Sequence, residues 1–217
     1  MSGSDGEQKT LLSGKQKILA VIGVVIAVAA ANPLIISLEP SSMVVKVFSD
    51  SMLLFAGGVL GFALYLWFMS GGGTTRGPGY GFYRGAKILG GTVYVWLVPA
   101  IVVLAWYSPT LVSISLSNGA FTAAEIFSMV VGGVFAGFAW GAMGKTMRSV
   151  TLFMIFFMSG TMGELLTEEG GSNVFFPNGY PYYTQTQILY TGYMMWLISL
   201  VPVTFYAVKF LKDMGAF

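Results

Sequence analysis

The side chains that could do chemistry in this sequence are carboxylates, hydroxyls and thioethers, because the chain contains no cysteine and no histidine. Thiolate nucleophiles, disulfide bonds, imidazole metal ligands and histidine-based acid–base catalysis are therefore excluded. No ionisable residue falls near the middle of an apolar stretch. Ion-coupled transporters usually keep such residues there, so the pattern argues against that class as well.

A methionine series is the first candidate metal site. Met154, Met158 and Met162 recur every four residues, which places them on one face of a helix. Thioethers are soft ligands that suit Cu(I). Methionine is also a flexible apolar residue that fills irregular gaps between helices. Without cysteine or histidine to complete a site, the series predicts packing rather than copper binding.

Acidic residues form the second candidate. Glu164, Glu168 and Glu169, together with Glu125, could attract cations at one face of the protein. They lack the ordered spacing of a calcium-binding loop. We therefore interpret them as a solvated acidic rim, and the sequence predicts no catalytic, cofactor-binding or metal-binding residue.

The elements that must position these groups are apolar helices. The chain is 55% hydrophobic and 9% charged, whereas soluble domains carry about 25% charged residues. A helix needs about 20 apolar residues to cross a bilayer. Six stretches fit this requirement, although the fifth is short: 18–38, 52–69, 88–107, 123–143, 150–166 and 188–210. Ser49 or Asp50 can cap the second of them, and Thr122 the fourth.

The predicted fold is therefore an all-α integral membrane protein with six transmembrane helices. Residues 1–17 are polar and predict a flexible cytoplasmic tail, residues 18–212 form one transmembrane domain, and residues 213–217 form a short second tail. Pro33 should kink the first helix near its far end.

Basic residues predict the orientation of the helices. With the N-terminus in the cytoplasm, six spans place all but one of the Lys and Arg residues on the cytoplasmic side, and only Lys46 outside. The cytoplasmic set is Lys9, Lys15, Lys17, Arg76, Arg84, Lys87, Lys145, Arg148, Lys209 and Lys212. This asymmetry indicates that both termini are cytoplasmic.

Glycines mark the faces where helices should pack closely. Gly133, Gly137 and Gly141 recur every four residues within 130–143 and form a stripe without side chains. Such a stripe destabilises a helix in water but lets another helix approach its backbone in a bilayer. The same role is predicted for three further glycines, which are Gly57, Gly61 and Gly163.

A possible internal repeat relates the two halves of the chain. Residues 79–97 align with 179–197 without a gap, and residues 52–61 align more loosely with 154–163. Three helices per copy would invert the second copy in the membrane, as in many transporters and channels. Chance similarity in a composition rich in Gly, Tyr, Trp and Leu is the alternative interpretation.

An aromatic loop over residues 174–183 is the candidate contact with a partner. Exposed aromatic side chains are costly in water and usually bind something. A partner subunit, the membrane surface and the protein's own helices are all possible contacts. The aromatic residues concerned are Phe175, Phe176, Tyr180, Tyr182 and Tyr183.

These features favour a non-catalytic subunit of a larger membrane complex with a structural or assembly role. A passive channel or facilitator for an ion or small solute is the alternative, and it rests on the possible repeat. An enzyme is the least favoured class. The expected partners are the lipid bilayer and other membrane subunits or further copies of the chain, with no cofactor and no nucleic acid.

Overall fold

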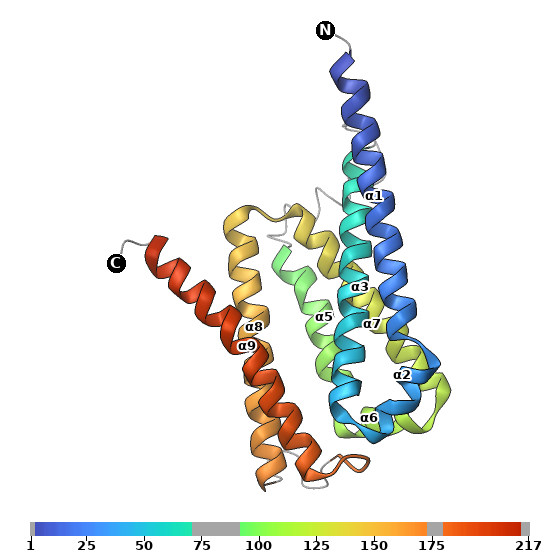
Figure 1. Ribbon diagram of the computed structural model, residues 1–217, viewed down its shortest axis with the longest axis vertical. Coiled ribbons are helices and arrows are strands. Elements are labelled where there is room, and N and C mark those ends of the chain that lie inside the picture. Colours follow the sequence, from blue (N-terminus) through green and yellow to red (C-terminus); the bar gives the residue numbers. More distant parts are fainter. Residues whose placement is uncertain (1–2, 71–91, 173–179, 214–217) are drawn as a thin grey trace. The chain divides into compact units, whose positions relative to one another are not determined.

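The computed structural model describes residues 3–70, 92–172 and 180–213, and every regular element in these ranges is a helix (Figure 1). The predicted loop over residues 71–85 lies outside the described residues. The elements are α1 (Gly3–Ala30), α2 (Pro33–Leu38), η1 (Glu39–Ser41), α3 (Met43–Ser70), α5 (Thr92–Trp106), α6 (Pro109–Ser117), α7 (Gly119–Ala142), α8 (Lys145–Ser172) and α9 (Gln185–Asp213). Within the described residues, five helices are long and apolar enough to cross a membrane, or up to six if a bent pair counts as one span.

The first span breaks where the sequence predicts it. α1 ends at Ala30, and Pro33 begins the short helix α2. The side-chain oxygen of Asn32 accepts a hydrogen bond from the backbone N–H of Leu34 at 2.9 Å and so starts α2. Proline suits a first helical position because its missing N–H would have no intrahelical partner there.

α1 begins much earlier than the predicted span at residue 18. Its first residue is Gly3, so helix occupies most of the stretch that the sequence predicts as a flexible tail. Gln16 is buried, and its side-chain amide donates to the backbone carbonyl of Leu66 in α3 at 2.9 Å. A tertiary contact with α3 therefore holds this residue, which lies in the stretch predicted as a tail.

α3 and α7 also begin before the predicted caps. α3 starts at Met43, and the hydroxyl of Ser42 accepts from the N–H of Val45 at 3.4 Å. The side chain of Asn118 caps α7 by accepting from the N–H of Ala120 at 2.9 Å. Both predicted start positions were too late, because each helix continues into more polar sequence before it reaches its cap.

The third predicted span, 88–107, corresponds to α5, and the chain continues beyond it through a bend into α6. The described part of α5 has 15 residues, or about 22 Å at 1.5 Å per residue, which is less than the thickness of a hydrocarbon core. The chain then bends by 73° into α6. Pro109 is the first residue of α6, so its fixed backbone angle favours a new helix there.

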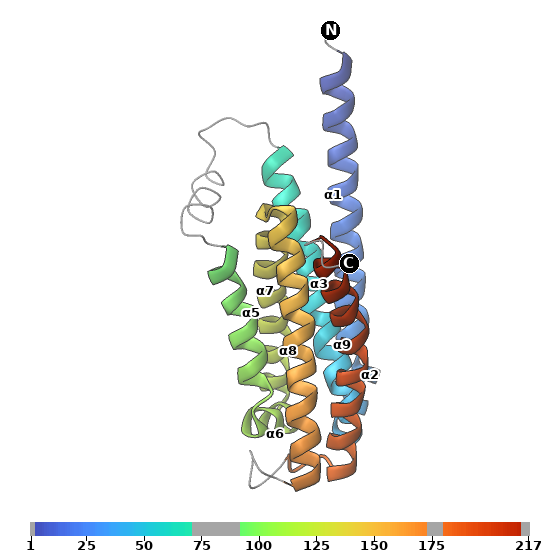
Figure 2. The same cartoon turned by 90° about the vertical axis from the view of Figure 1, so that its left-hand side faces the viewer.

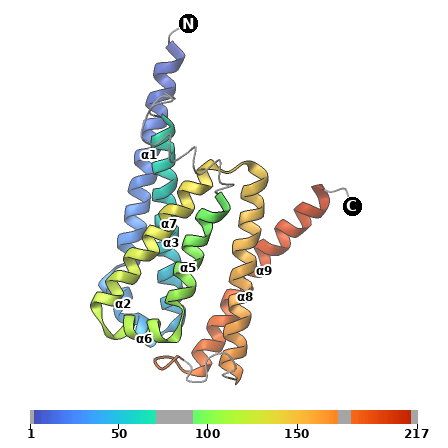
Figure 3. The ribbon, with the colours of Figure 1, turned by 180° about the vertical axis from the view of Figure 1, so that it is seen from behind.

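The chain folds as two compact units. Unit 1 comprises Met1–Ile36 and Phe48–Met143, and unit 2 comprises Ser37–Val47 and Gly144–Phe217. In unit 1, α7 contacts both α3 and α5, and α6 lies at the end of the unit where α7 begins (Figure 3). In unit 2, α8 and α9 pair along much of their length (Figure 2). α3 contributes its first turn to unit 2 and the rest to unit 1.

Candidate functional site: close helix contacts and buried polar groups at helix ends

The closest helix contact in unit 1 joins α3 to α7 through glycines. A Cβ atom added at Gly137 would lie 2.6 Å from the carbonyl carbon of Gly58. Gly57 and Gly133 face each other, and a Cβ on either would lie 2.9 Å from the Cα of the other. Any side chain at these positions would therefore meet the backbone of the other helix, which cannot move aside as a flexible side chain can.

Two further glycines from the sequence prediction lie along the same contact. A Cβ at Gly61 would be 2.8 Å from the Cα of Val134. Gly141 faces the ring of Tyr65 instead of backbone. The Tyr65 ring in turn makes an edge contact with Phe138, with ring centroids 5.8 Å apart. The glycine contact thus ends in an aromatic cluster.

Unit 2 has its own glycine contact between α8 and α9. A Cβ at Gly163 would lie 2.8 Å from the carbonyl oxygen of Gly192, and one at Gly192 would lie 2.6 Å from that of Gly163. A Cβ at Gly170 would lie 2.7 Å from the backbone nitrogen of Leu189. The sequence singled out Gly163 but missed Gly170 and Gly192, since neither belongs to a four-residue series.

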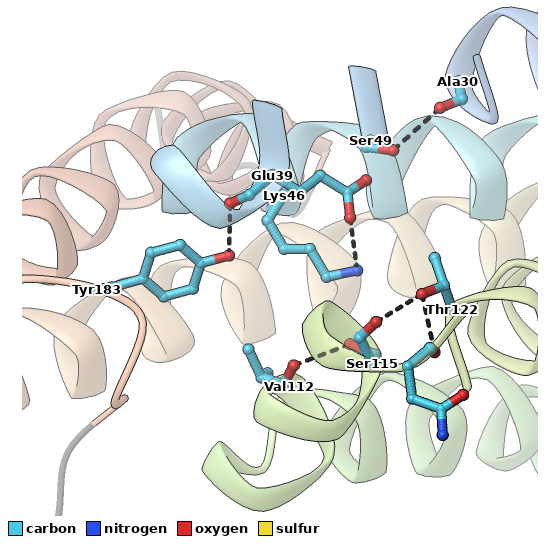
Figure 4. A network of polar contacts seen from close by, with 9 residues as sticks. Ala30, Glu39, Lys46, Ser49, Val112, Ser115, Thr122 and Tyr183 are labelled. Carbon is cyan, nitrogen blue, oxygen red and sulfur yellow. Dashed lines mark hydrogen bonds and ion pairs between the residues drawn. The ribbon is translucent and has the colours of Figure 1, made fainter. Parts of the chain in front are cut away.

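Side chains in unit 1 tie helix ends to one another. The hydroxyl of Ser49 in α3 donates to the carbonyl oxygen of Ala30 at the end of α1, at 3.2 Å (Figure 4). The hydroxyl of Thr122 in α7 donates to the carbonyl oxygen of Ser115 in α6 (Figure 4). Thr122 therefore has a tertiary contact instead of the capping role that the sequence predicts. Glu125 is buried one turn further along α7, so it does not belong to a solvated rim.

In unit 2, two side chains from the start of α9 hold the turn between α2 and α3. The phenol of Tyr183 donates to the carbonyl oxygen of Glu39 at 2.9 Å (Figure 4). The side-chain amide of Gln187 donates to the carbonyl oxygen of Ser41 at 2.7 Å. The residues on either side of these bonds lie more than 140 positions apart, with separations of 144 and 146. Only the tertiary fold could bring them together.

The same turn contains a buried ion pair. The Nζ of Lys46 lies 3.4 Å from a carboxylate oxygen of Glu39, and each side chain is 5% exposed (Figure 4). Lys46 is the basic residue that the sequence places alone on the outer side. Removing one member of a buried pair leaves the other charge buried without compensation, which is strongly destabilising. The pair therefore fixes the path of the chain from η1 into α3.

Gln187 is oriented by a capping box at the start of α9. The N–H of Thr184 donates to the Oε1 of Gln187 at 3.1 Å, and the N–H of Gln187 donates to the hydroxyl of Thr184 at 3.3 Å. This reciprocal Thr-x-x-Gln arrangement satisfies two donors at a helix N-terminus. It also turns the amide nitrogen of Gln187 toward Ser41. The motif could have been read from the sequence, but its second contact could not.

Tyr180 and Glu169 are both buried in unit 2. Burial of the phenol raises the pKa of Tyr180 from 10.0 to about 12, and the negative charge of Glu169 adds to the rise. Tyr183 is buried as well, whereas Tyr182 is 44% exposed. Phe175 and Phe176 lie outside the described residues. Of the described tyrosines in this predicted partner loop, two are therefore enclosed by the protein itself.

The structure shows how exposed the residues of the two candidate metal sites are. Met154 and Met158 are about half exposed on α8. Glu164 and Glu168 are exposed on the same helix, but Glu169 is buried. Among the described residues, no group of three or more His, Cys, Asp and Glu side chains is placed to hold a metal ion.

These helices and their contacts indicate a multi-pass α-helical membrane protein. The chain belongs to the family described as "Protein of unknown function (DUF1404)", whose family model matches residues 21–213. No curated protein and no solved structure matches the chain. The matched residues include most of both units and both glycine contacts.

Proposed function

We propose that the protein is a non-catalytic subunit of a larger membrane complex, with a structural or assembly role. The observation that carries this proposal is that buried and half-buried polar side chains form hydrogen bonds with the backbone of other elements. Five of them donate to a backbone carbonyl in a different element: Gln16 to Leu66, Ser49 to Ala30, Thr122 to Ser115, Tyr183 to Glu39, and Gln187 to Ser41. Such bonds hold helix ends in fixed positions, as a structural or assembly role would require.

The apolar face of α9 supports the same proposal. Exposed large side chains recur every three or four residues along this helix, so they share one face: Tyr190, Met194, Leu197, Val201, Phe205 and Val208. Aromatic residues and methionine are enriched where proteins meet. We assign this face to an apolar membrane-spanning helix of a neighbouring subunit, with lipid covering the remaining apolar surfaces.

The orientation with both termini in the cytoplasm is part of this proposal. It is supported by the sequence pattern, because six spans with the N-terminus inside would place every Lys and Arg except Lys46 on the cytoplasmic side. The burial of Lys46 against Glu39 adds to this support, because it removes the one outer cation from the charge asymmetry. Accessibility of single cysteines introduced near each end of α9 to a membrane-impermeant reagent would test the orientation.

Mass measurement of the protein extracted in native lipid discs tests the proposed role. We expect a mass well above the 23.3 kDa of one chain. The variant Val201→Asp, which places a charge on the exposed face of α9, should release the monomer. The matched variant Val28→Asp, on the equally exposed α1, should leave the complex intact. A monomer in native discs of the unaltered protein would contradict the proposal.

A passive channel or facilitator is the second candidate, and one observation favours it. α8 begins 102 positions after α3. At the same offset, Gly58 corresponds to Gly160 and Gly61 to Gly163. This correspondence supports an inverted repeat of three helices, a common plan in channels and transporters. Flux of ions and small neutral solutes into liposomes containing the protein tests it, and flux no greater than that of empty liposomes would contradict it.

A further inference from the structure

The α8–α9 pair in unit 2 is closely packed along only part of its length. The two helices run antiparallel, and their backbones approach each other at Gly163 and Gly192. Further toward the start of α8, a Cβ at Gly160 would make only an ordinary contact with the Cβ of Ser199, at 3.5 Å. Among the residues that the structure describes, Gly163 is the first buried residue of α8 and Ser199 is the last buried residue of α9. Residues 145–162 of α8 and 200–213 of α9 are therefore the loosely packed end of the pair, which we call the open end.

Two features of α9 favour a bend where the open end begins. Pro202 lies inside the helix and has no N–H to donate to the carbonyl oxygen of Ile198, and its ring crowds that carbonyl. The hydroxyl of Ser199 donates to the carbonyl oxygen of Met195 at 2.7 Å, and such a bond to the preceding turn often bends a helix. Figures 1 and 3 show the C-terminal end of α9 lying away from the start of α8.

The side chains that face the other helix at the open end are apolar and only half-buried. On α8, a spacing of four residues from Gly160 leads to Phe156 and then to Leu152. On α9, the same spacing from Ser199 leads to Val203. Space left between apolar side chains forfeits dispersion contacts, so apolar groups from outside the pair must complete the packing here.

The open end is also basic. Arg148 lies near the start of α8, and the exposed residues Lys209 and Lys212 lie near the end of α9. Because the helices are antiparallel, these three residues are at the same end of the pair. The sequence of 145–162 and 200–213 contains one further basic residue, Lys145, and one acidic residue, Asp213. Basic residues between membrane helices are typical binding sites for anionic lipid headgroups.

We propose that the open end of the α8–α9 pair binds one anionic phospholipid. Its headgroup lies against Arg148, Lys209 and Lys212, and its acyl chains lie between the apolar residues of the two helices. A helix of another protein would supply apolar side chains but would not account for the basic residues on both helices. The site is on the opposite side of α9 from Val201 and Phe205, so it does not depend on the proposed role as a subunit.

Titration of phosphatidylglycerol into the delipidated full-length protein tests the headgroup contacts, with bound lipids counted by native mass spectrometry. Lys209→Gln/Lys212→Gln should raise the lipid concentration that half-saturates the site by about tenfold, because each basic residue near an anionic headgroup contributes to binding. The matched control Lys15→Gln/Lys17→Gln removes two exposed lysines of α1 and should leave this concentration nearly unchanged. Lys209→Arg/Lys212→Arg retains both charges and should bind the lipid as the parent protein does.

Photolabelling of the unaltered protein in lipid discs tests the position of the acyl chains and requires no variant to fold. The probe is phosphatidylglycerol with a diazirine on one acyl chain, compared with phosphatidylcholine that has the same chain. We expect phosphatidylglycerol to label Leu152, Phe156 and Val203 several times more than phosphatidylcholine does.

Three outcomes would overturn the proposal. The first is an unchanged half-saturating concentration in Lys209→Gln/Lys212→Gln. The second is equal labelling by the two lipids, because the headgroup would then make no selective contact. The third is labelling concentrated at Val201 and Phe205, as expected for lipid that covers the outer surface of α9 without a site.

Discussion

The α3/α7 contact in unit 1 and the α8/α9 contact in unit 2 both bring helix backbones together, but they use glycine differently. In α3/α7, Gly57 and Gly58 face Gly133 and Gly137, so neither helix presents a side chain there. In α8/α9, Gly192 faces the backbone of Gly163 and also Thr167, whose hydroxyl is held by the carbonyl oxygen of Gly163 at 2.8 Å. In the α3/α7 contact, several glycines of each helix face the other helix. In the α8/α9 contact, α9 contributes only Gly192.

The two contacts differ in how readily the neighbouring atoms can move when a glycine is replaced by a larger residue. Helix association in a bilayer depends on close packing, because lipid is as apolar as the side chains. At Gly57, Gly58, Gly133 and Gly137 the α3/α7 contact achieves this with backbone, which cannot move aside as a side chain can. In the α8/α9 contact, a Cβ at Gly192 would also meet the side chain of Thr167, which can adjust. We therefore expect substitutions to be more damaging in α3/α7 than in α8/α9.

The largest effect is expected for Gly137→Leu. Its side chain would overlap the backbone of Gly58, so α3 and α7 would have to separate. We expect a loss of more than about 3 kcal/mol in the free energy of unfolding, the upper range for overpacking, and little folded protein on size-exclusion chromatography. Gly119→Leu is the control, because nothing lies within 4 Å of a Cβ at Gly119. Normal folding of the Gly137 variant would mean that α3 and α7 do not pack as described.

High pH should weaken unit 2 through Tyr180. The pKa of Tyr180 is raised from 10.0 to about 12 in the folded protein, so the folded state keeps a proton that the unfolded state loses. The resulting stability is fully present below pH 10 and is lost as the pH rises from about 10 to about 12. The loss should reach about 2–3 kcal/mol at 1.36 kcal/mol per pKa unit.

Comparison of variants isolates this titration from that of the other tyrosines. Unfolding of the parent protein, Tyr180→Phe and Tyr182→Phe should be followed from pH 9 to pH 12. Tyr180→Phe should show a smaller loss of stability with pH than the parent protein, and Tyr182→Phe, at a side chain that is 44% exposed, is the matched control. Equal pH dependence in all three proteins would contradict the burial of Tyr180 beside Glu169.

Gly192→Ala should have an intermediate effect on the α8/α9 contact. The added methyl group would lie 2.6 Å from the carbonyl oxygen of Gly163, so the helices must shift slightly apart. We expect a loss of about 2 kcal/mol, with faster hydrogen exchange in α8 and α9 but not in α7. A larger loss than that of Gly137→Ala would reverse the comparison between the two contacts.

The smallest effect is expected for Gly160→Ala. A Cβ at this position would make an ordinary contact with the Cβ of Ser199 at 3.5 Å. Alanine also favours helix over glycine by up to about 1 kcal/mol. The thermal midpoint should therefore stay the same or rise slightly. A clear decrease would show that α8 and α9 approach more closely near Ser199 than the structure indicates.

The sequence by itself determined that the chain is a helical membrane protein, and it identified most of the glycines that lie at close helix contacts. Apolar stretches of about 20 residues require helices in a bilayer, because unpaired backbone groups are too costly there. The break at Pro33 followed from the same local chemistry. The bounds were less accurate: α3 begins at Met43, and Gln16 in the predicted tail bonds to Leu66, a contact that hydropathy does not register.

The tertiary structure alone decided which polar residues matter. Lys46 and Glu39 look like ordinary charges at the ends of spans, yet they form a buried pair. Tyr183 belongs to an aromatic loop that suggests an external partner, yet its phenol binds the carbonyl of Glu39. Hydrophobic periodicity and glycine spacing are local properties of one helix, so the sequence carries them directly. The hydrogen bond between Tyr183 and Glu39, 144 positions apart, exists only once the folded chain has brought these two residues together.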